Sequence, residues 1–242
     1  MAQIDKPSLH FNTKLYNGTG STQSITGVGF QPDWVWFKHR GGADGHNLFD
    51  AVRGATKRLR SNSTGAENTG ADTLTSFDSD GFSLGADTTG DGVNINGYNN
   101  VTWNWKANGS GSANTDGSIS STVSVNTTAG FSIVKWTGTN SNGTIGHGLG
   151  TTPSLFISKS MAGSHAWGVY HKSIGIGSTT LLNSNGASDA DATYYGGTSP
   201  TSTIMGLGTA NATNASGNMI GYAFAEKKGY SKFGSYTGNG NA

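Results

Sequence analysis

Two histidines that lie close together in the chain have the chemistry to bind a metal. His39 and His46 flank residues 41–44, which end in Asp44, so two imidazoles and a carboxylate could meet around one ion. The segment is also polar and rich in glycine, which is typical of an exposed loop. We favour the loop, expect no metal ligands in it, and keep His39 and His46 as candidates for contact with a partner.

Aspartates in two glycine-containing turns are spaced like the oxygen ligands of a calcium loop. Asp87 and Asp91 frame one turn, and Asp78 and Asp80 frame the other. An EF-hand loop needs a bidentate glutamate at its twelfth position, but the twelfth residue counted from Asp87 is Tyr98. The pattern therefore favours plain turns without a cofactor, with calcium as the alternative.

Side chains suited to catalysis are scarce in this sequence. Glu67 and Glu226 are the only glutamates, and neither has an evident acidic partner of the kind that sugar cleavage requires. The chain has no cysteine and no Gly-x-Ser-x-Gly nucleophile turn, and its glycine-rich runs lack the lysine of a phosphate loop. We expect a protein that is not an enzyme; a depolymerase is the less favoured alternative.

Exposed aromatic rings could stack on sugars while neighbouring amides and carboxylates bind the hydroxyls. Trp167, Tyr170, Tyr194 and Tyr195 lie where such a surface could form. Trp167 alternates with Val169, which also fits a place in a buried strand. We keep Trp167, Tyr194 and Tyr195 as candidates for surface recognition.

The elements that must position these residues follow an internal repeat, displaced by about 120 residues. Residues 30–38 (FQPDWVWFK) are echoed by residues 151–159 (TTPSLFISK), and residues 15–19 (LYNGT) by residues 135–139 (KWTGT). Residues 235–240 begin the pattern again. The sequence therefore predicts two copies of one module, followed by the opening strand of another.

Short apolar runs with period two predict that the module is built from strands. Val101, Trp103 and Trp105 share one face of such a run, and Tyr222 and Phe224 take the corresponding places in the second copy. A sustained helical period is absent, and turn residues are frequent. We expect an all-β chain of two tandem antiparallel β-sandwich modules with these rings inside. The rings assigned to the core are Trp34, Trp36, Trp103, Trp105 and Tyr222.

The expected organisation has five parts. An N-terminal arm covers residues 1–10, the first sandwich residues 11–107 and the second residues 119–230. Residues 108–118 lack large apolar groups and are interpreted as a linker. Residues 231–242 would form the opening strand of a third repeat, with Phe233 and Tyr236 as candidate assembly residues.

The charge balance gives no reason to expect nucleic acid or a membrane as a partner. The net charge is +1, and charged residues make up 12% of the chain, about half the usual share. Residues 1–60 hold eight Lys and Arg against four acids, whereas residues 61–130 hold one against seven. We interpret this asymmetry as two solvated faces.

The lack of cysteine, of a secretion signal and of a long apolar run indicates the compartment in which the chain folds. Without cysteine there is no disulfide framework, and the N-terminal residues do not form a secretion signal. No apolar run approaches the ~20 residues that span a bilayer. We expect a chain that folds in the cytoplasm of a bacterial host.

Several longer stretches share a common pattern. They are residues 11–16 (FNTKLY), 29–38 (GFQPDWVWFK), 49–56 (FDAVRGAT), 74–82 (LTSFDSDGF), 146–150 (GHGLG) and 225–240 (AEKKGYSKFGSYTGNG). These stretches resemble a repeat family found in virion structural proteins of marine tailed bacteriophages. The resemblance implies a lectin-like jelly-roll fold and a structural or tail-fibre-like role, and it brings no catalytic residues. It also implies a place in the virion, after assembly in the host cytoplasm.

The sequence and the resemblance together predict a non-enzymatic virion protein on the particle exterior, either a fibre-like appendage or a capsid decoration. It would associate with other virion proteins and with itself through terminal strands, and it could contribute to attachment to the host. The alternative is a carbohydrate-binding module that recognises a glycan of the host surface. Recognition would fall to the loops that differ between the copies, residues 40–47, 160–166 and 186–200.

Overall fold

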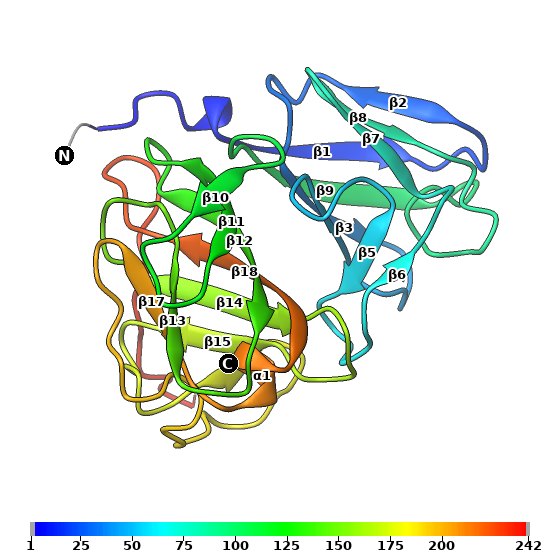
Figure 1. Cartoon of the computed structure of the whole chain (residues 1–242). Helices are drawn as coiled ribbons and strands as arrows, with labels where there is room; N and C mark the ends of the chain where they lie inside the picture. Colours follow the sequence, from blue (N-terminus) through cyan, green and yellow to red (C-terminus); the bar gives the residue numbers. More distant parts are fainter. Residues whose placement is uncertain (1–2, 241–242) are drawn as a thin grey trace.

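The computed structural model describes residues 3–240 as an all-β protein in which every pairing within the sheets is antiparallel (Figure 1). The two short helices are η1 (Pro7–Leu9) and α1 (Asn211–Asn214). Neither of them, nor any other helix in the described part of the chain, could cross a membrane.

The first half contributes nine strands. They are β1 (Phe11–Asn17), β2 (Gln23–Thr26), β3 (Trp34–His39), β4 (Asn47–Asp50), β5 (Lys57–Arg60), β6 (Asn68–Thr69), β7 (Leu74–Asp78), β8 (Gly81–Leu84) and β9 (Asn99–Trp105). One sheet has the order β1-β9-β3-β4-β5-β6, and a smaller one has the order β2-β8-β7. Their facing sides enclose an apolar core of Ile25, Val35, Phe37, Phe49, Leu74, Phe82, Leu84 and Val93.

The second half also contributes nine strands. They are β10 (Ser112–Asn114), β11 (Ser121–Asn126), β12 (Phe131–Gly138), β13 (Gly143–Gly146), β14 (Leu155–Ser160), β15 (Gly168–His171), β16 (Thr180–Leu181), β17 (Ile204–Leu207) and β18 (Gly217–Phe224). The large sheet has the order β10-β11-β12-β18-β14-β15-β16, and β13 pairs with β17. Between these two layers lies a second core, which includes Val134, Trp136, Phe156, Tyr195 and Met205.

The two large sheets have corresponding strand orders. Strands β1-β9-β3-β4-β5 of the first half occupy the same sequence of places as β12-β18-β14-β15-β16 of the second. The register agrees as well, because Trp34 lies opposite Trp105, and Leu155, its sequence counterpart, lies opposite Phe224. The two large sheets therefore share a strand order over these five strands and a register at this position.

One buried asparagine fixes the loop ends of the first half. Asn94 accepts a hydrogen bond from the N–H of Thr19 at Oδ1, and its Nδ2 donates to the carbonyls of Ser21 and Gly85. The side chain thus pairs three backbone groups, of which the carbonyl of Gly85 is buried and would otherwise lack a partner.

Asn214 makes the same set of bonds in the second half. Its Oδ1 accepts from the N–H of Thr139, and its Nδ2 donates to the carbonyls of Ser141 and Gly208. The partners are the sequence counterparts of those of Asn94, so the two halves agree in side-chain chemistry as well as in strand order.

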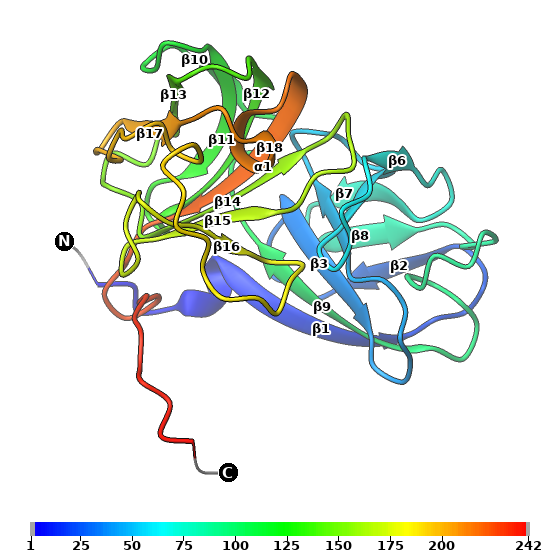
Figure 2. The same ribbon diagram turned by 90° about the horizontal axis from the view of Figure 1, so that it is seen from below.

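The two large sheets pack against each other through their outer faces. Trp34 lies at the centre of this contact, stacked on Tyr222 with ring centroids 4.3 Å apart. Both rings are buried, and Phe131, Ile133 and other apolar residues of the second half complete the cluster. Figure 2 shows the two halves side by side along this contact.

This packing corrects the expectation that the duplicated rings lie inside each sandwich. Strand alternation sends Val35 and Phe37 into the core of the first half, and it sends Trp34 and Trp36 to the opposite face. The alternation of β3 is therefore present, but the face that carries Trp34 and Trp36 packs against the other half of the protein. Trp36, Trp103 and Trp105 lie on that face and are half-buried.

Segments predicted to be an arm and a linker take part in the fold. Ile4 is buried, and its N–H donates to the carbonyl of Lys228. Within the expected linker, β10 pairs with β11, and the N–H of Gly109 donates to Asp33. Asp33 also accepts the N–H of Ala107, the residue just before this segment. The two halves are therefore joined by ordered backbone.

The C-terminal residues contribute little to the sheets. Ser231 forms an isolated bridge with Lys227, and residues 232–240 form no strand with the rest of the described chain. Phe233 packs on Phe224, whereas Tyr236 is 94% exposed. Figure 2 shows this segment running away from the body of the protein, and residues 241–242 lie outside the described part.

Candidate functional site

A pocket of about 280 Å³ opens at the junction of the two halves. Its floor and walls combine one large ring with polar groups and one aliphatic side chain. The lining residues are Trp36, His46, Ser61 and Asn62 from the first half, and Leu182, Asn183, Ser184 and Asn185 from the second.

The fold places Trp36 here through the alternation of β3. Trp34 lies two residues earlier on the same face and is covered by Tyr222, but the second half does not extend far enough to cover Trp36 fully. Trp36 also meets the edge of Trp103, with ring centroids 6.4 Å apart. A half-exposed, laterally supported indole of this kind provides a rigid face for a ligand.

Two asparagines of the pocket are held by their carbonyl oxygens. Oδ1 of Asn62 accepts the N–H of His46, and Oδ1 of Asn183 accepts the N–H of Trp167, with distances of 2.9 and 2.8 Å. No hydrogen bond uses the Nδ2 of either residue within residues 3–240. Each amide therefore has a fixed orientation and two N–H donors left for a ligand.

The turn of residues 60–63 forms one wall and is fixed by a residue of the other half. The N–H of Ser63 donates to the carbonyl of Arg60, closing the turn. Trp167 is fully buried, and its indole N–H lies 3.0 Å from the carbonyl of Arg60 and 3.2 Å from that of Ser63. The second half therefore positions this wall of the pocket.

His46 adds an imidazole to the pocket. Burial, followed by the positive charge of Lys38, lowers the pKa of His46 below its usual value of 6.5. At neutral pH the ring is uncharged, so it offers one donor and one acceptor. With Trp36 and the two asparagines, the pocket presents an apolar face bordered by neutral hydrogen-bonding groups.

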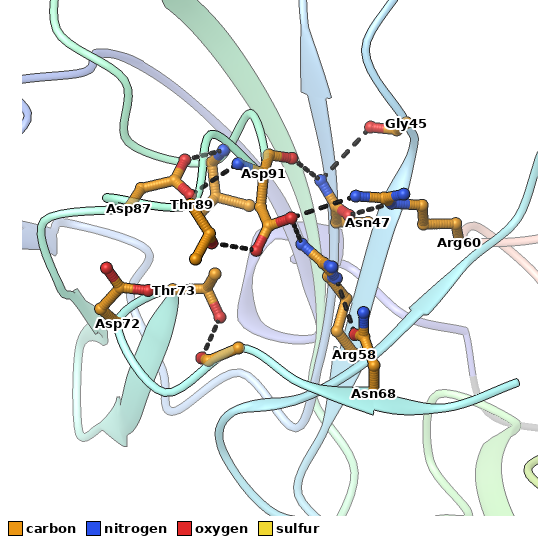
Figure 3. A network of polar contacts seen from close by, with 12 residues as sticks. Gly45, Asn47, Arg58, Arg60, Asn68, Asp72, Thr73, Asp87, Thr89 and Asp91 are labelled. Atoms are coloured by element: carbon orange, nitrogen blue, oxygen red, sulfur yellow. Dashed lines mark hydrogen bonds and ion pairs between the residues drawn. The ribbon is translucent and has the colours of Figure 1, made fainter.

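A charged network lies beside this pocket (Figure 3). Oδ1 of Asp91 contacts both Arg58 and Arg60, while its Oδ2 accepts the hydroxyl of Thr89. Asn47 donates to the carbonyl of Asp91 and so anchors its backbone. Burial opposes ionisation of Asp91, but the hydrogen bonds and positive charges of Arg58 and Arg60 and the hydroxyl of Thr89 outweigh it and lower its pKa.

This network changes the interpretation of the charge asymmetry. Arg58 and Arg60 of the basic segment pair with Asp91 of the acidic one, and Arg53 pairs with Glu67 in the same way. The expectation of two solvated faces is wrong for these groups, because the opposite charges meet and three of the five side chains are nearly or fully buried. Those three are Arg53, Arg58 and Asp91.

The aspartates that resembled calcium ligands hold turns together. Both carboxylate oxygens of Asp87 accept backbone N–H groups, from Asp91, Val93 and Asn94. Asp80 accepts the N–H groups of two glycines in the same manner. The described residues contain no group of three or more His, Asp or Glu arranged to hold a metal ion.

The structure spreads the predicted recognition residues over several environments. Trp167 and Tyr195 are fully buried, so neither offers a ring to solvent. His39 is also buried, stacked on Tyr98 at 3.7 Å and bonded to Asp44. Tyr194 is half-exposed and donates to Asp189, and His46 alone among these residues lines the junction pocket.

Sequence reasoning missed most of the pocket. Trp36 was assigned to the core because its strand alternates, and alternation does not show how far an opposing sheet reaches. Asn62 and Asn183 carried no sequence signal, since their roles come from bonds to backbone that is distant in sequence.

A second, apolar pocket of about 320 Å³ lies under the C-terminal segment. Its walls include Trp34, Trp105 and Phe224, and Tyr230 and Phe233 cover part of it. It offers apolar contact with very few hydrogen-bonding groups.

Comparison with known families places the chain in one of them. A family model described as a domain of unknown function (DUF7483) matches residues 6–242, so the chain belongs to that family. No curated protein and no solved structure matches the chain significantly.

Proposed function

We propose that this member of the family is a non-enzymatic structural protein on the exterior of a bacteriophage particle. It would be a fibre-like appendage or a capsid decoration and would contribute to attachment to the host. The resemblance of residues 29–38 and 49–56 to repeats of phage virion proteins supports this proposal. The observation that carries it is the shared apolar core of the two halves, which forms one scaffold that displays neutral polar loops.

The finer architecture belongs to the same proposal. We interpret the two halves as tandem lectin-like jelly-roll modules that arose from one repeat. The matching strand orders and the equivalent bonds of Asn94 and Asn214 support this interpretation.

Self-association would use an open sheet edge. Within residues 3–240, no strand pairs with the outer edge of β1, and Leu15 on this strand is 64% exposed. Its counterpart β12 is covered by β11. An open antiparallel edge accepts an added strand from another chain. Other virion proteins or a second copy would supply that strand.

The test is the composition of purified particles. Mass spectrometry of virions should detect the protein at a fixed copy number, and immunogold labelling should place it on the outside of the capsid or tail. Absence from particles after complete infection would contradict the proposal.

A carbohydrate-binding role is the second candidate, and the junction pocket favours it. Trp36 offers a flat apolar face, and the free amide donors of Asn62 and Asn183 lie on either side of the junction. Sugars combine an apolar ring face with hydroxyl groups and so fit this arrangement. The ligand would be a glycan of the host surface.

A glycan array separates this role from a purely structural one. The unmodified protein should bind a defined set of glycans, and Trp36→Ala should abolish the binding. Tyr236→Ala is the control, because Tyr236 is an exposed aromatic residue that neither lines the pocket nor contacts Trp36. Equal loss with both variants, or no signal from the unmodified protein, would reject glycan binding at Trp36.

A further inference from the structure

A small polar pocket lies on the other side of the turn of residues 60–63. It has a volume of about 130 Å³, large enough for several waters or one small anion. Arg58, Arg60 and Ser63 line it, together with Gly65, Ala66 and Asn68. No carboxylate lines this pocket.

The two arginines carry more positive charge than their acidic partner neutralises. Both guanidinium groups contact the same oxygen of Asp91, so one carboxylate serves two cations. Figure 3 shows Asp91 between Thr89 and the two guanidinium groups, with Asn68 beyond Arg58. Asn68 lines the pocket, and Asp91 does not. An anion in the pocket would complete the pairing of charges.

The arginines are held in place before any ligand arrives. Arg58 is 4% exposed, and its Nε donates to Oδ1 of Asn68 at 3.0 Å. The stem of Arg60 lies over Gly45, where a Cβ would come within 2.7 Å of Cδ. Residue 45 must therefore lack a side chain for Arg60 to take this position.

Donors remain available on the side of the pocket. In the described chain, no hydrogen bond is found for Nη2 of Arg58 or Nη1 of Arg60. Oγ of Ser63 accepts the N–H of Gly65, which leaves its hydroxyl proton free to donate. Guanidinium and hydroxyl donors of this kind suit the oxygens of a carboxylate or a sulfate.

One turn separates this pocket from the junction pocket. Ser61 and Asn62 face the pocket of Trp36, while Arg60 and Ser63 face the arginine pocket. A hydrogen-bonded turn brings its first and last Cα atoms within about 7 Å of each other. A ligand stacked on Trp36 could therefore extend an acidic substituent past the turn.

We propose that Arg58 and Arg60 bind the carboxylate or sulfate group of an acidic glycan whose neighbouring sugar docks on Trp36. The inference rests on the proposed carbohydrate-binding role and narrows its ligand class to acidic polysaccharide.

The first test uses the anion alone, which makes it independent of glycan binding. Sodium sulfate and sodium acetate are titrated into the full-length protein at constant ionic strength, and the amide signals of residues 63–68 are followed by NMR. Saturable shifts are expected, and Arg60→Gln should weaken binding by about tenfold or more, since bonds to a charged group are lost. Arg60 is partly exposed, so the variant should fold.

Lys57→Gln is the matched control for net charge. Lys57 lies on the same strand, and its Nζ bonds to Thr69 rather than to the pocket. It should leave the titration unchanged. Shifts that do not saturate, or that weaken equally in both variants, would overturn the inference.

The second test compares matched neutral, carboxylated and sulfated oligosaccharides. Preference for an acidic form that is lost in Arg60→Gln supports the inference, and the preferred form identifies the acid. Binding of neutral and acidic forms with equal affinity would overturn it while leaving glycan recognition by Trp36 intact. Sulfate binding without binding of any oligosaccharide would overturn both the inference and the carbohydrate role.

Discussion

The hydroxyl of Tyr222 donates a hydrogen bond of 2.8 Å to Oδ2 of Asp50 and so joins β18 of the second half to β4 of the first. Nε of Arg53 bonds to the same oxygen, and all three side chains are buried. Burial, and next the charge of Asp50, raise the pKa of the Tyr222 hydroxyl well above its usual value, so it stays a donor. This bond ties the halves together at a polar point inside an apolar contact.

Replacing Tyr222 with Phe should lower the free energy of unfolding by about 1.5–3 kcal/mol. The stack on Trp34 is retained, but the buried carboxylate of Asp50 loses one of its donors. Urea denaturation measures the change. Tyr236→Phe serves as the control because Tyr236 is almost fully exposed, and an equal loss in both variants would contradict the role of the bond.

Replacing Asn94 or Asn214 with alanine should lower the free energy of unfolding by similar amounts. Alanine at either place removes three hydrogen bonds to backbone groups, one of them to a buried carbonyl, which should cost about 2–4 kcal/mol. The halves share a core, so each variant should unfold in a single transition seen alike by fluorescence and circular dichroism. Asn185→Ala, on an exposed turn, should change little. Two separate transitions would mean that the halves are energetically independent.

Lys159 should make the free energy of unfolding depend on pH in the alkaline range. Its Nζ is buried and bonds to the carbonyls of Ser160 and Gly163, and burial lowers its pKa from 10.5 to about 8. Between these values the unfolded chain binds more protons than the folded chain, so the free energy of unfolding rises with pH, by up to about 3 kcal/mol.

The rise should be clearest between about pH 8 and 10, because buried tyrosines with raised pKa values oppose it at higher pH. Urea denaturation at a series of pH values gives the profile, and Lys159→Met should flatten it. Lys38→Met is the control: Lys38 is the counterpart of Lys159 and donates to the carbonyl of Gly42, but it is only half-buried. A profile unaffected by Lys159→Met would show that other groups cause the rise.

Substitutions of Trp34 and Trp36 should have different effects, the first mainly on stability and the second mainly on ligand binding. Trp34→Ala empties the centre of the contact between the halves and should cost about 3–5 kcal/mol. Trp36→Ala removes a half-exposed ring and should cost about 1 kcal/mol while changing the pocket. Denaturation curves of both variants, compared with their glycan binding, test this division. Similar destabilisation by the two would contradict it.

Much of the fold could be predicted from the residues, because strand signals are local. The run from Trp34 to Lys38 alternates and forms a strand. The repeat matches Tyr222 and Phe224 to Trp103 and Trp105, and β18 pairs with β14 as β9 pairs with β3. The packing of one sheet on the other could not be predicted, since a pattern of faces does not show which partner covers them. The structure shows the partner, because Trp34 of the first half stacks on Tyr222 of the second.

The candidate site was less predictable for a related reason. His46 was found through its side-chain chemistry, but Asn62 and Asn183 act through backbone that lies far away in sequence. Arg58 and Asp91 were counted as members of two charged segments, and only the fold shows that they pair. The spacing of residues along the chain does not show which distant residues will contact each other.

The last strand of each large sheet lies between two strands that precede it in the sequence, and this order affects how the protein folds during translation. Strand β18 fits between β12 and β14, so residues 161–216 must be translated before those two strands acquire their common neighbour. At about 5–20 residues per second, the edges of β12 and β14 that will face β18 stay unpaired on the nascent chain for several seconds. Substitutions in β18 should therefore reduce the yield of expressed protein more than the thermal stability of the molecules that finish folding.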